Sequence, residues 1–317
     1  GGSDAFLALL DEDGATRRCV RFGDAEHQAI TGIALDPAGR IVVAGEAAGA
    51  IDLGGGPLVS AGGEDLFVAT LDASLGHVWS QRFGDADEDR LPRLARAPSG
   101  QLALAGIYRG RIDLGGGPLP DRYDGGFVAL LESDGRQAWS HGFVGDRHES
   151  PVAVAFDAAG DVIVGGRFGG NVDFGSGVRT SASGEDAFVA SWDPGGEPRW
   201  SVRFGGDGED SVNGLAVDPA GHIHVCGELT TSLDGLVARG GPDMFVAELD
   251  DRGAMLFRAS FGDEGEQHAY RLALREGAPV VIGSFFGALD FGAAGRFVSN
   301  GGFDPSAGDL FVVRFRR

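Results

Sequence analysis

The sequence contains no lysine, so all 26 of its basic residues are arginine, against 47 acidic residues. The formal net charge is −21 at pH 7. Binding to nucleic acid or to an anionic membrane needs a basic surface, so this charge argues against both as partners. It favours solubility and interaction with cations or with a basic partner.

Long apolar runs and a cysteine framework are also missing. No stretch of about 18 consecutive apolar residues occurs, so the sequence predicts no membrane insertion. Two cysteines cannot form a disulfide framework, and Cys226 falls where other repeats have Ala or Gly, which predicts a small buried residue. We recognise no signal peptide. The first residue is Gly1 instead of Met, which favours a mature product or an excised segment.

Catalytic motifs are lacking as well. The sequence has no Gly-x-Ser-x-Gly, and its Gly-rich segments do not follow a strand and open a helix, as a phosphate-binding loop must. Acidic residues are plentiful, but they recur in register with the repeat described next, which favours a structural role. We therefore predict that the protein is not an enzyme, and a glycosidase-like activity is the weakest alternative.

What the sequence does contain is a repeat of about 60 residues. The phrase Asp-x-Phe-Val-Ala-x-Leu-Asp, or a close variant, occurs six times. It places a phenylalanine at Phe6, Phe67, Phe127, Phe188, Phe245 and Phe311. A fixed period built from short apolar runs indicates a repeat architecture. Each period has four short runs of β type, Gly-rich turns and no helical periodicity, which is typical of one propeller blade.

The repeat predicts an all-β fold: a five-bladed β-propeller of four-stranded blades that forms a single domain over residues 1–317. The five units lie at about 30–84, 91–145, 151–205, 212–262 and 269–317, and residues 1–23 close the ring between the two ends of the chain. The last unit lacks an outer strand, and Ala15–Phe22 can supply it. A closed ring hides the strand edges that would otherwise be exposed.

This closure leaves Asp4–Leu10 as a surplus copy of the third strand. Folded proteins seldom expose an apolar strand edge. Three arrangements follow: a fifth strand beside Ala15–Phe22 in the closing blade, displacement of the C-terminal copy, or strand addition to another chain. The short link to Ala15–Phe22 favours the first arrangement.

Three phrases resemble the bacterial β-propeller repeats called SBBP. They are FVATLDASLGHVWSQRFGD, IALDPAGRIVVAG and IDLGGGPLVSAGGEDLFVA. The resemblance covers nearly the whole chain. The resemblance implies an extracellular or cell-envelope location and a binding or scaffold role, without a catalytic motif. The family name refers to seven blades, whereas this chain has material for five.

The loops predict where a site would lie. Short Asp-Pro-Ala-Gly turns and Leu-Asp-x-x-Gly hairpins collect at one end of the blades, and the long loops collect at the other. Functional residues concentrate on long loops over a rigid scaffold, so we expect any site at the long-loop end. Asp52, Asp113, Asp173, Asp234 and Asp290 recur in these loops, which predicts that they shape the loop backbone.

Acidic connections lead into each first strand and place a ring of candidate metal ligands at the channel mouth. The ring consists of His27, Glu88, Asp89, His148, Glu149, Glu209, Asp210 and Glu266. Oxygen-rich loops suit Ca²⁺, and the two histidines could suit a transition metal. In the alternative interpretation, which we favour, each side chain hydrogen-bonds a backbone group in the neighbouring blade. The fold itself requires no cofactor.

A second set of candidates differs between the repeats. Aromatic residues and arginines, the usual anchors of recognition, occur in the loop of the second unit and in the last unit. They are Tyr108, Arg109, Arg111, Tyr123, Phe285 and Phe286. Packing under the loops explains them equally well. We predict a binding or scaffold module that engages a protein partner, or copies of itself through Asp4–Leu10. A lectin-like propeller that binds a glycan is the alternative.

Overall fold

The computed structural model describes residues 2–233, 235–292, 295–300 and 308–315. Over these ranges the chain forms β-strands joined by turns and loops, without an α-helix. No helix in this part of the chain could span a membrane. The contacts within the chain divide it into two compact units, Gly1–Gly142 and Phe143–Arg317.

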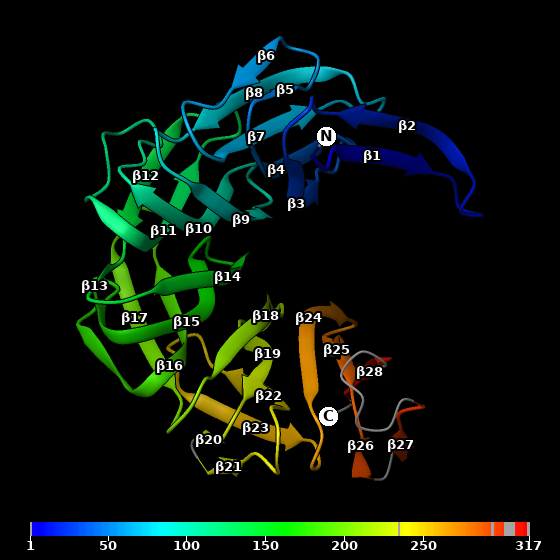
Figure 1. Ribbon diagram of the computed structural model, residues 1–317, viewed down its shortest axis with the longest axis vertical. Coiled ribbons are helices and arrows are strands. Elements are labelled where there is room, and N and C mark those ends of the chain that lie inside the picture. Colours follow the sequence, from blue (N-terminus) through cyan, green and yellow to red (C-terminus); the bar gives the residue numbers. More distant parts are fainter. Residues whose placement is uncertain (1, 234, 293–294, 301–307, 316–317) are drawn as a thin grey trace. The chain divides into compact units, whose positions relative to one another are not determined.

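The first unit holds two four-stranded antiparallel sheets and two hairpins (Figure 1). The first sheet has the order β3 (Gln28–Leu35), β4 (Ile41–Ala47), β7 (Asp65–Leu71) and β8 (His77–Phe83). The second sheet has the order β9 (Asp89–Arg96), β10 (Leu102–Gly110), β11 (Arg122–Leu131) and β12 (Gln137–Gly142). The hairpins are β1 (Ala5–Leu10) with β2 (Thr16–Phe22), and β5 (Ala50–Asp52) with β6 (Pro57–Val59).

The second unit holds three sheets and two short hairpins. In the first sheet, β14 (Glu149–Phe156) and β13 (Val144–Gly145) both pair with β15 (Val162–Asp173). Strand β15 also pairs with β16 (Val178–Trp192), and β16 pairs with β17 (Pro198–Phe204). The next sheet has the order β18 (Ser211–Val217), β19 (Ile223–Leu229), β22 (Asp243–Leu249) and β23 (Met255–Phe261). The last sheet has the order β24 (Gln267–Arg275), β25 (Ala278–Phe285) and β28 (Asp309–Arg314). The hairpins are β20 (Ser232–Leu233) with β21 (Leu236–Val237), and β26 (Ala288–Asp290) with β27 (Arg296–Val298).

Each of the five sheets is built from strands of one continuous stretch of the chain, in chain order apart from short strands inserted between them, which is the organisation of a propeller blade. The prediction of an all-β fold with five propeller blades is therefore confirmed. Closure of the ring by Ala15–Phe22, and a single domain over 1–317, would both join the two units. These two statements stay predictions.

Short turns with aspartate and glycine separate the strands, as the sequence predicts. The Asp36 carboxylate accepts a hydrogen bond from the backbone N–H of Arg40 at 2.7 Å, and Gly39 takes a φ of 80° that favours glycine. In the hairpin between β7 and β8, Asp72 Oδ1 accepts from the N–H groups of Ser74 and Gly76 at 2.8 Å. These local bonds define where each strand ends.

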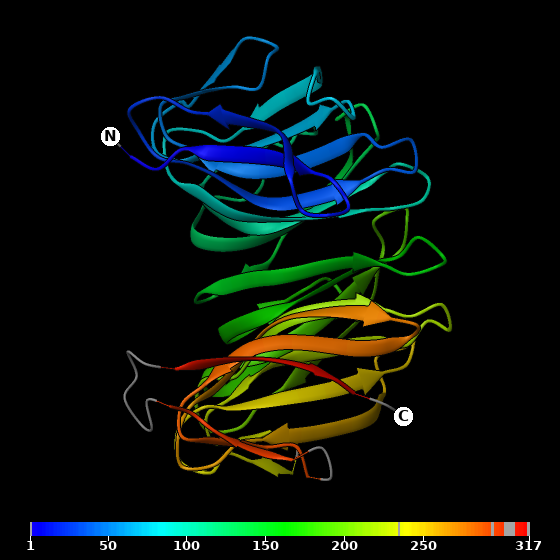
Figure 2. The same cartoon turned by 90° about the vertical axis from the view of Figure 1, so that its right-hand side faces the viewer.

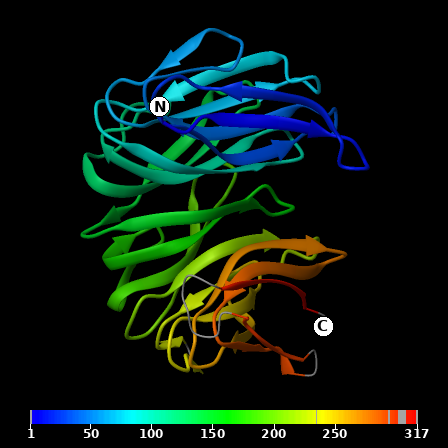
Figure 3. The ribbon, with the colours of Figure 1, turned by 45° about the vertical axis from the view of Figure 1, so that its right-hand side comes forward.

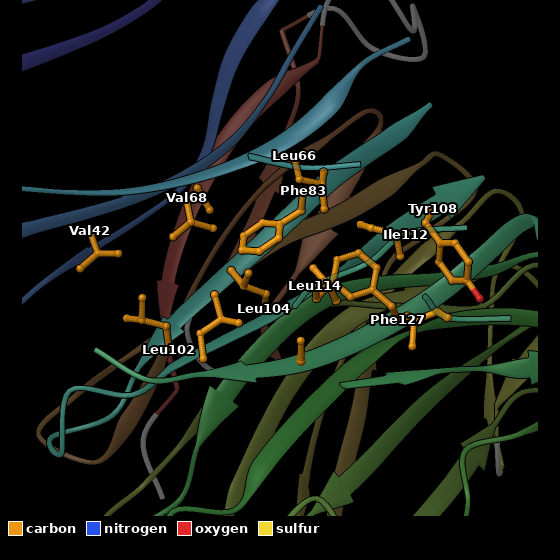
Figure 4. Packing of buried hydrophobic residues seen from close by; sticks show 14 residues of the cluster. Val42, Leu66, Val68, Phe83, Leu102, Leu104, Tyr108, Ile112, Leu114 and Phe127 are labelled. Carbon is orange, nitrogen blue, oxygen red and sulfur yellow. The ribbon is translucent and has the colours of Figure 1, made fainter. Parts of the chain in front are cut away.

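The phenylalanine of the repeat builds the core between neighbouring sheets. Phe127 is fully buried and lies with Tyr108, Ile112 and Leu114 in the first unit (Figure 4). The equivalent Phe67, Phe188 and Phe245 are also buried. Tryptophans of the outer strands contact the next blade: Trp79 Nε1 donates to the backbone oxygen of Ser133 at 3.1 Å, and Trp200 Nε1 to that of Asp251 at 2.9 Å.

Candidate functional site

The ring of candidate ligands divides into buried and accessible positions. The residue at the start of each first strand, Gln28, Asp89, Glu149, Asp210 and Gln267, is at most 1% exposed. Gln28 Nε2 donates to the backbone oxygen of Ala48 at 2.7 Å, and Gln267 Nε2 to that of Phe286 at 3.0 Å. Asp210 accepts from the N–H groups of Gly206 and Thr230 at 3.1 and 3.2 Å. Ala48, Thr230 and Phe286 each follow the second strand of the same blade, so these side chains bond to backbone within their own blade and not in a neighbouring one.

Asp89 departs from this pattern, because neither of its buried carboxyl oxygens accepts a hydrogen bond of normal geometry, although the backbone N–H groups of Asp85 and Arg109 are close enough to lower its pKa. The carboxyls of Asp89 and Asp65 both lie against Gly84, where an added Cβ would collide with each. Burial, followed by the negative charges of Asp65 and Asp85, raises the pKa of Asp89 to about 8, against a weaker opposing effect of the backbone N–H groups of Asp85 and Arg109. Burial also raises the pKa of Asp65. At neutral pH, Asp89 is therefore protonated in the folded protein.

The accessible ring positions make ion pairs within their own units. His27 Nε2 lies 3.9 Å from carboxylate oxygens of both Glu46 and Glu64. The Glu266 carboxylate lies 3.4 Å from His268 Nε2. Glu209 is exposed and His148 is half-buried. Over the described ranges, no three His, Cys, Asp or Glu side chains are grouped so as to hold a metal ion.

The second-blade loop brings together several of the predicted recognition residues. Arg109 donates to Glu88 at 3.2 Å and to Asp124 at 3.0 Å, and its guanidinium lies 4.7 Å from the centre of the Tyr123 ring. Tyr123 is 79% exposed. Arg111 extends from the same loop to Asp121, with 3.4 Å between Nε and Oδ2. Glu88 thus serves as a partner of Arg109, and Tyr123 is the aromatic ring this loop offers to solvent.

Tyr108 has the surroundings that the packing alternative predicts. It is fully buried, its hydroxyl donates to the backbone oxygen of Pro120 at 2.8 Å, and its ring packs edge-on against Phe127. Tyr108 is therefore a core residue, because its only polar atom is satisfied inside the protein. Phe285 is likewise 4% exposed, while Phe286 is half-buried beside the His268 ring. The aligned positions Ala47, Phe168 and Leu229 are also buried, so these positions form no aromatic platform for a glycan.

The loop aspartates shape the loop backbone, as predicted. Asp52 Oδ1 accepts from the N–H groups of Gly54 and Gly56 at 2.8 and 3.0 Å. Asp113 and Asp173 make the same two bonds in their own loops, and Asp290 accepts from Gly292. Asp234 lies outside the described residues.

The N-terminal hairpin has the structure of the outer half of a blade (Figure 3). Its register, with Ala5 opposite Phe22 and a bulge before Leu10, matches that of β7 and β8, where Leu66 lies opposite Phe83. Strand β7 also pairs with β4, whereas β1 pairs with β2 alone among the described strands. One face of the hairpin packs into the first unit through Ala5, Leu7 and Phe22. On the other face Phe6 is 66% exposed, although the Phe at this position is buried in every other repeat.

The last sheet has the complementary open edge. Strand β28 lies at the margin of its sheet (Figure 2) and pairs with β25 alone among the described strands. Leu310 and Val312 are 81% and 73% exposed, whereas the equivalent Leu66 and Val68 in the first complete blade are fully buried. A hollow of about 510 Å³ adjoins this strand and is lined by apolar side chains such as Phe291, Phe297 and Leu310. Strand β28 therefore combines an unpaired backbone edge with an apolar surface.

A cluster that the sequence reasoning did not single out lies in the fourth blade. His224 on β19 lies opposite Glu248 on β22, and both are close to Asp218 and His222 in the adjoining turn. It adjoins the short turns, at the end of the blades where we expected no site. The signal was present in the repeat: the pair equivalent to His224–Glu248 is Val42–Thr70 in the first complete blade and Ala103–Leu130 in the second.

Comparison with known proteins supports the fold without identifying a family. No model of a known protein family matches the chain. Regulatory protein FlaEY of Caulobacter vibrioides is 28% identical over 244 residues, which are 73% of this chain and 24% of FlaEY. The chain thus spans about a quarter of the length of that relative. Hydrazine synthase of Kuenenia stuttgartiensis is similar in structure, with a TM-score of 0.53 at 12% identity over 98% of this chain and 77% of that chain. At this identity the similarity concerns the fold alone.

Proposed function

We propose that the protein is a binding or scaffold module that engages a protein partner, or further copies of itself, by strand pairing at its open edges. The observation that carries the proposal is the contrast between Leu310 and Val312 on β28, which are exposed, and the buried residues at the same positions of a complete blade. An added strand would satisfy the free backbone groups of β28 and cover its apolar side chains.

The N-terminal hairpin offers a second edge of the same kind. In a complete blade a second strand pairs with the edge that β1 leaves unpaired, and a neighbouring blade covers the surface that Phe6 exposes. Strand pairing supplies affinity through backbone hydrogen bonds, and alternate side chains supply specificity. Both edges are built from the repeat, so another copy of this chain has strands with the matching pattern.

One of the two similar proteins, hydrazine synthase, is named as an enzyme, and the other bears a regulatory name. FlaEY is named a regulatory protein, and a binding module fits such a role without requiring chemistry. An extracellular or cell-envelope location is part of the proposal and rests on the resemblance to the SBBP repeats.

Light scattering of the full chain against a chain that starts at Gly14 tests the proposal for self-association. We expect the full chain to form oligomers at high concentration and the shortened chain, which lacks β1, to remain monomeric. A matched control is Arg17→Ala, which changes an exposed residue of β2 and keeps Phe6 and the strand edge. If the full chain stays monomeric at high concentration and β28 residues show no protection on addition of a cell-envelope extract, the proposal is refuted.

A further inference from the structure

A cavity of about 330 Å³ lies in the second unit between the fourth blade and the last blade. Its walls are mostly apolar and include Val246, Phe257, Leu272 and Phe315. Two polar side chains, His224 and Glu248, also line it. Small-molecule sites are typically apolar cavities of this size or larger, with a few polar groups that orient the ligand.

The polar pair is specific to this cavity. His224 and Glu248 face each other across β19 and β22, and they are 3% and 13% exposed as side chains. The equivalent pairs in the other complete blades are Val42–Thr70, Ala103–Leu130 and Ile163–Ser191. Burying ionisable groups costs free energy, and three blades fold without them. The construction of a blade therefore does not require this pair.

The corresponding space in the first unit is filled. There Val42 packs with Leu102 and Leu131, which are buried members of one core cluster. In the second unit the same repeat positions hold His224, Pro279 and Phe315, and all three line the cavity. The repeat that has a polar residue, His224, in place of Val42 is thus also the one in which the space is open, with Pro279 and Phe315 in place of Leu102 and Leu131.

The geometry of the polar groups favours a cationic ligand. His224 Nε2 lies 3.3 Å from Asp218 Oδ2, and the tautomer that donates from Nε2 to this carboxylate leaves Nδ1 without a proton. Its Nδ1 then carries a lone pair and lies 4.0 Å from Glu248 Oε2, which is also an acceptor and is too distant for a hydrogen bond. His222 Nδ1 lies 3.4 Å from both Asp218 and Glu248. The cluster therefore contains the carboxylates of Asp218 and Glu248. Two of its acceptor atoms, Glu248 Oε2 and His224 Nδ1, lie 4.0 Å apart, so that one ammonium group can donate to both.

We propose that this cavity binds a small organic amine in its protonated form. The apolar body of the ligand would contact Phe257, Leu272 and Phe315, and the ammonium group would donate to Glu248 Oε2 and His224 Nδ1. Aromatic walls favour a cation as well, through the electrostatics of the ring face. This site is distinct from the strand edges and does not depend on assembly.

Three phenyl compounds of similar size and different charge test the proposal at pH 7.5: 2-phenylethylamine, 2-phenylethanol and phenylacetate. Calorimetry or NMR titration of the full chain should show that the amine binds at least about tenfold more tightly than the other two. Equal binding of all three probes, tighter binding of the carboxylate, or no binding of the amine at millimolar concentration would each overturn it.

Variants locate the site. The double variant His224→Val, Glu248→Thr installs the pair of the first complete blade, and we expect it to lose the preference for the amine. Leu272→Trp should fill the cavity and weaken all three probes by about tenfold or more. His268→Gln, which lies outside the cavity and pairs with Glu228 and Glu266, is the matched control and should bind the amine like the original chain. A double variant that folds and keeps the preference refutes the assignment.

Discussion

The buried Asp89 carboxyl leads to a prediction of how the free energy of unfolding depends on pH. Replacement of Asp89 by Asn keeps the shape of the side chain and removes the ability to ionise. The other repeats show that a neutral amide is compatible with this position, because Gln28 and Gln267 occupy it. We therefore expect Asp89→Asn to stabilise the protein at neutral and alkaline pH.

The magnitude follows from the difference between the pKa of Asp89 in the folded and unfolded states. Its value rises from 3.8 to about 8 on folding. Below pH 4 both states hold the proton, so Asp89 affects stability little. Between pH 4 and 8 the unfolded state loses the proton while the folded state keeps it, so the free energy of unfolding falls by up to about 1.4 kcal/mol per pH unit. Above pH 8 the loss is complete.

The full span of this shift corresponds to roughly 6 kcal/mol, which is a ceiling because water entry and side-chain movement reduce the cost of a buried charge. We expect Asp89→Asn to be about 2 to 4 kcal/mol more stable than the original chain at pH 8, and nearly equal to it at pH 4.

Denaturant unfolding of both proteins at intervals between pH 4 and 9 measures this difference. Effects of all other ionisable groups largely cancel between the two proteins. Asp52→Asn, at an exposed aspartate, is a control that should show no comparable rise with pH. A stability difference that does not change with pH would refute the assignment of Asp89 as a protonated buried acid.

Three further predictions concern the loops and the edges. Asp52→Ala should lower the free energy of unfolding by about 1 kcal/mol, because the N–H groups of Gly54 and Gly56 lose an acceptor; denaturant unfolding measures this loss, and an unchanged value would contradict the loop-shaping role. Phe6→Asp should weaken self-association without loss of stability, because Phe6 is exposed; sedimentation over a concentration series checks this, and unaltered assembly would exclude Phe6 from the contact. Millimolar Ca²⁺ and EDTA should give the same melting curve if Glu88 and Glu266 serve only as ion-pair partners, whereas a higher melting temperature in Ca²⁺ would restore the metal hypothesis.

The repeat made much of the local structure predictable. The phenylalanine that recurs in every period, such as Phe127, implied one strand in each blade. The turn aspartates, such as Asp72, implied where the strands end. The role of Asp52 could also be predicted, because a residue that recurs in the loops is expected to stabilise the backbone conformation that these loops share. These inferences succeed since they depend on short-range backbone geometry that each copy of the repeat must satisfy.

The candidate site was less predictable, because a side chain's surroundings come from other strands. Tyr108 differs from its counterparts in the repeat, which left recognition and packing equally open, and the structure shows that it packs against Phe127 and donates to the backbone oxygen of Pro120. Glu88 could have been a metal ligand, but Arg109 from β10 lies beside it. The sequence pattern cannot distinguish a carboxylate that faces solvent from one that faces a guanidinium.

The sequence by itself determined the all-β class, the five blades and the surplus third strand, because periodicity and turn chemistry are local properties. Only the tertiary structure decided which strand edges are unpaired within each unit. It shows that β1 and β28 each leave an edge unpaired within the described residues, and that His224 and Glu248 line a cavity between two blades of the second unit. Such features depend on how separate repeats pack against one another. The sequence of one repeat does not specify which side chains of the next repeat contact it.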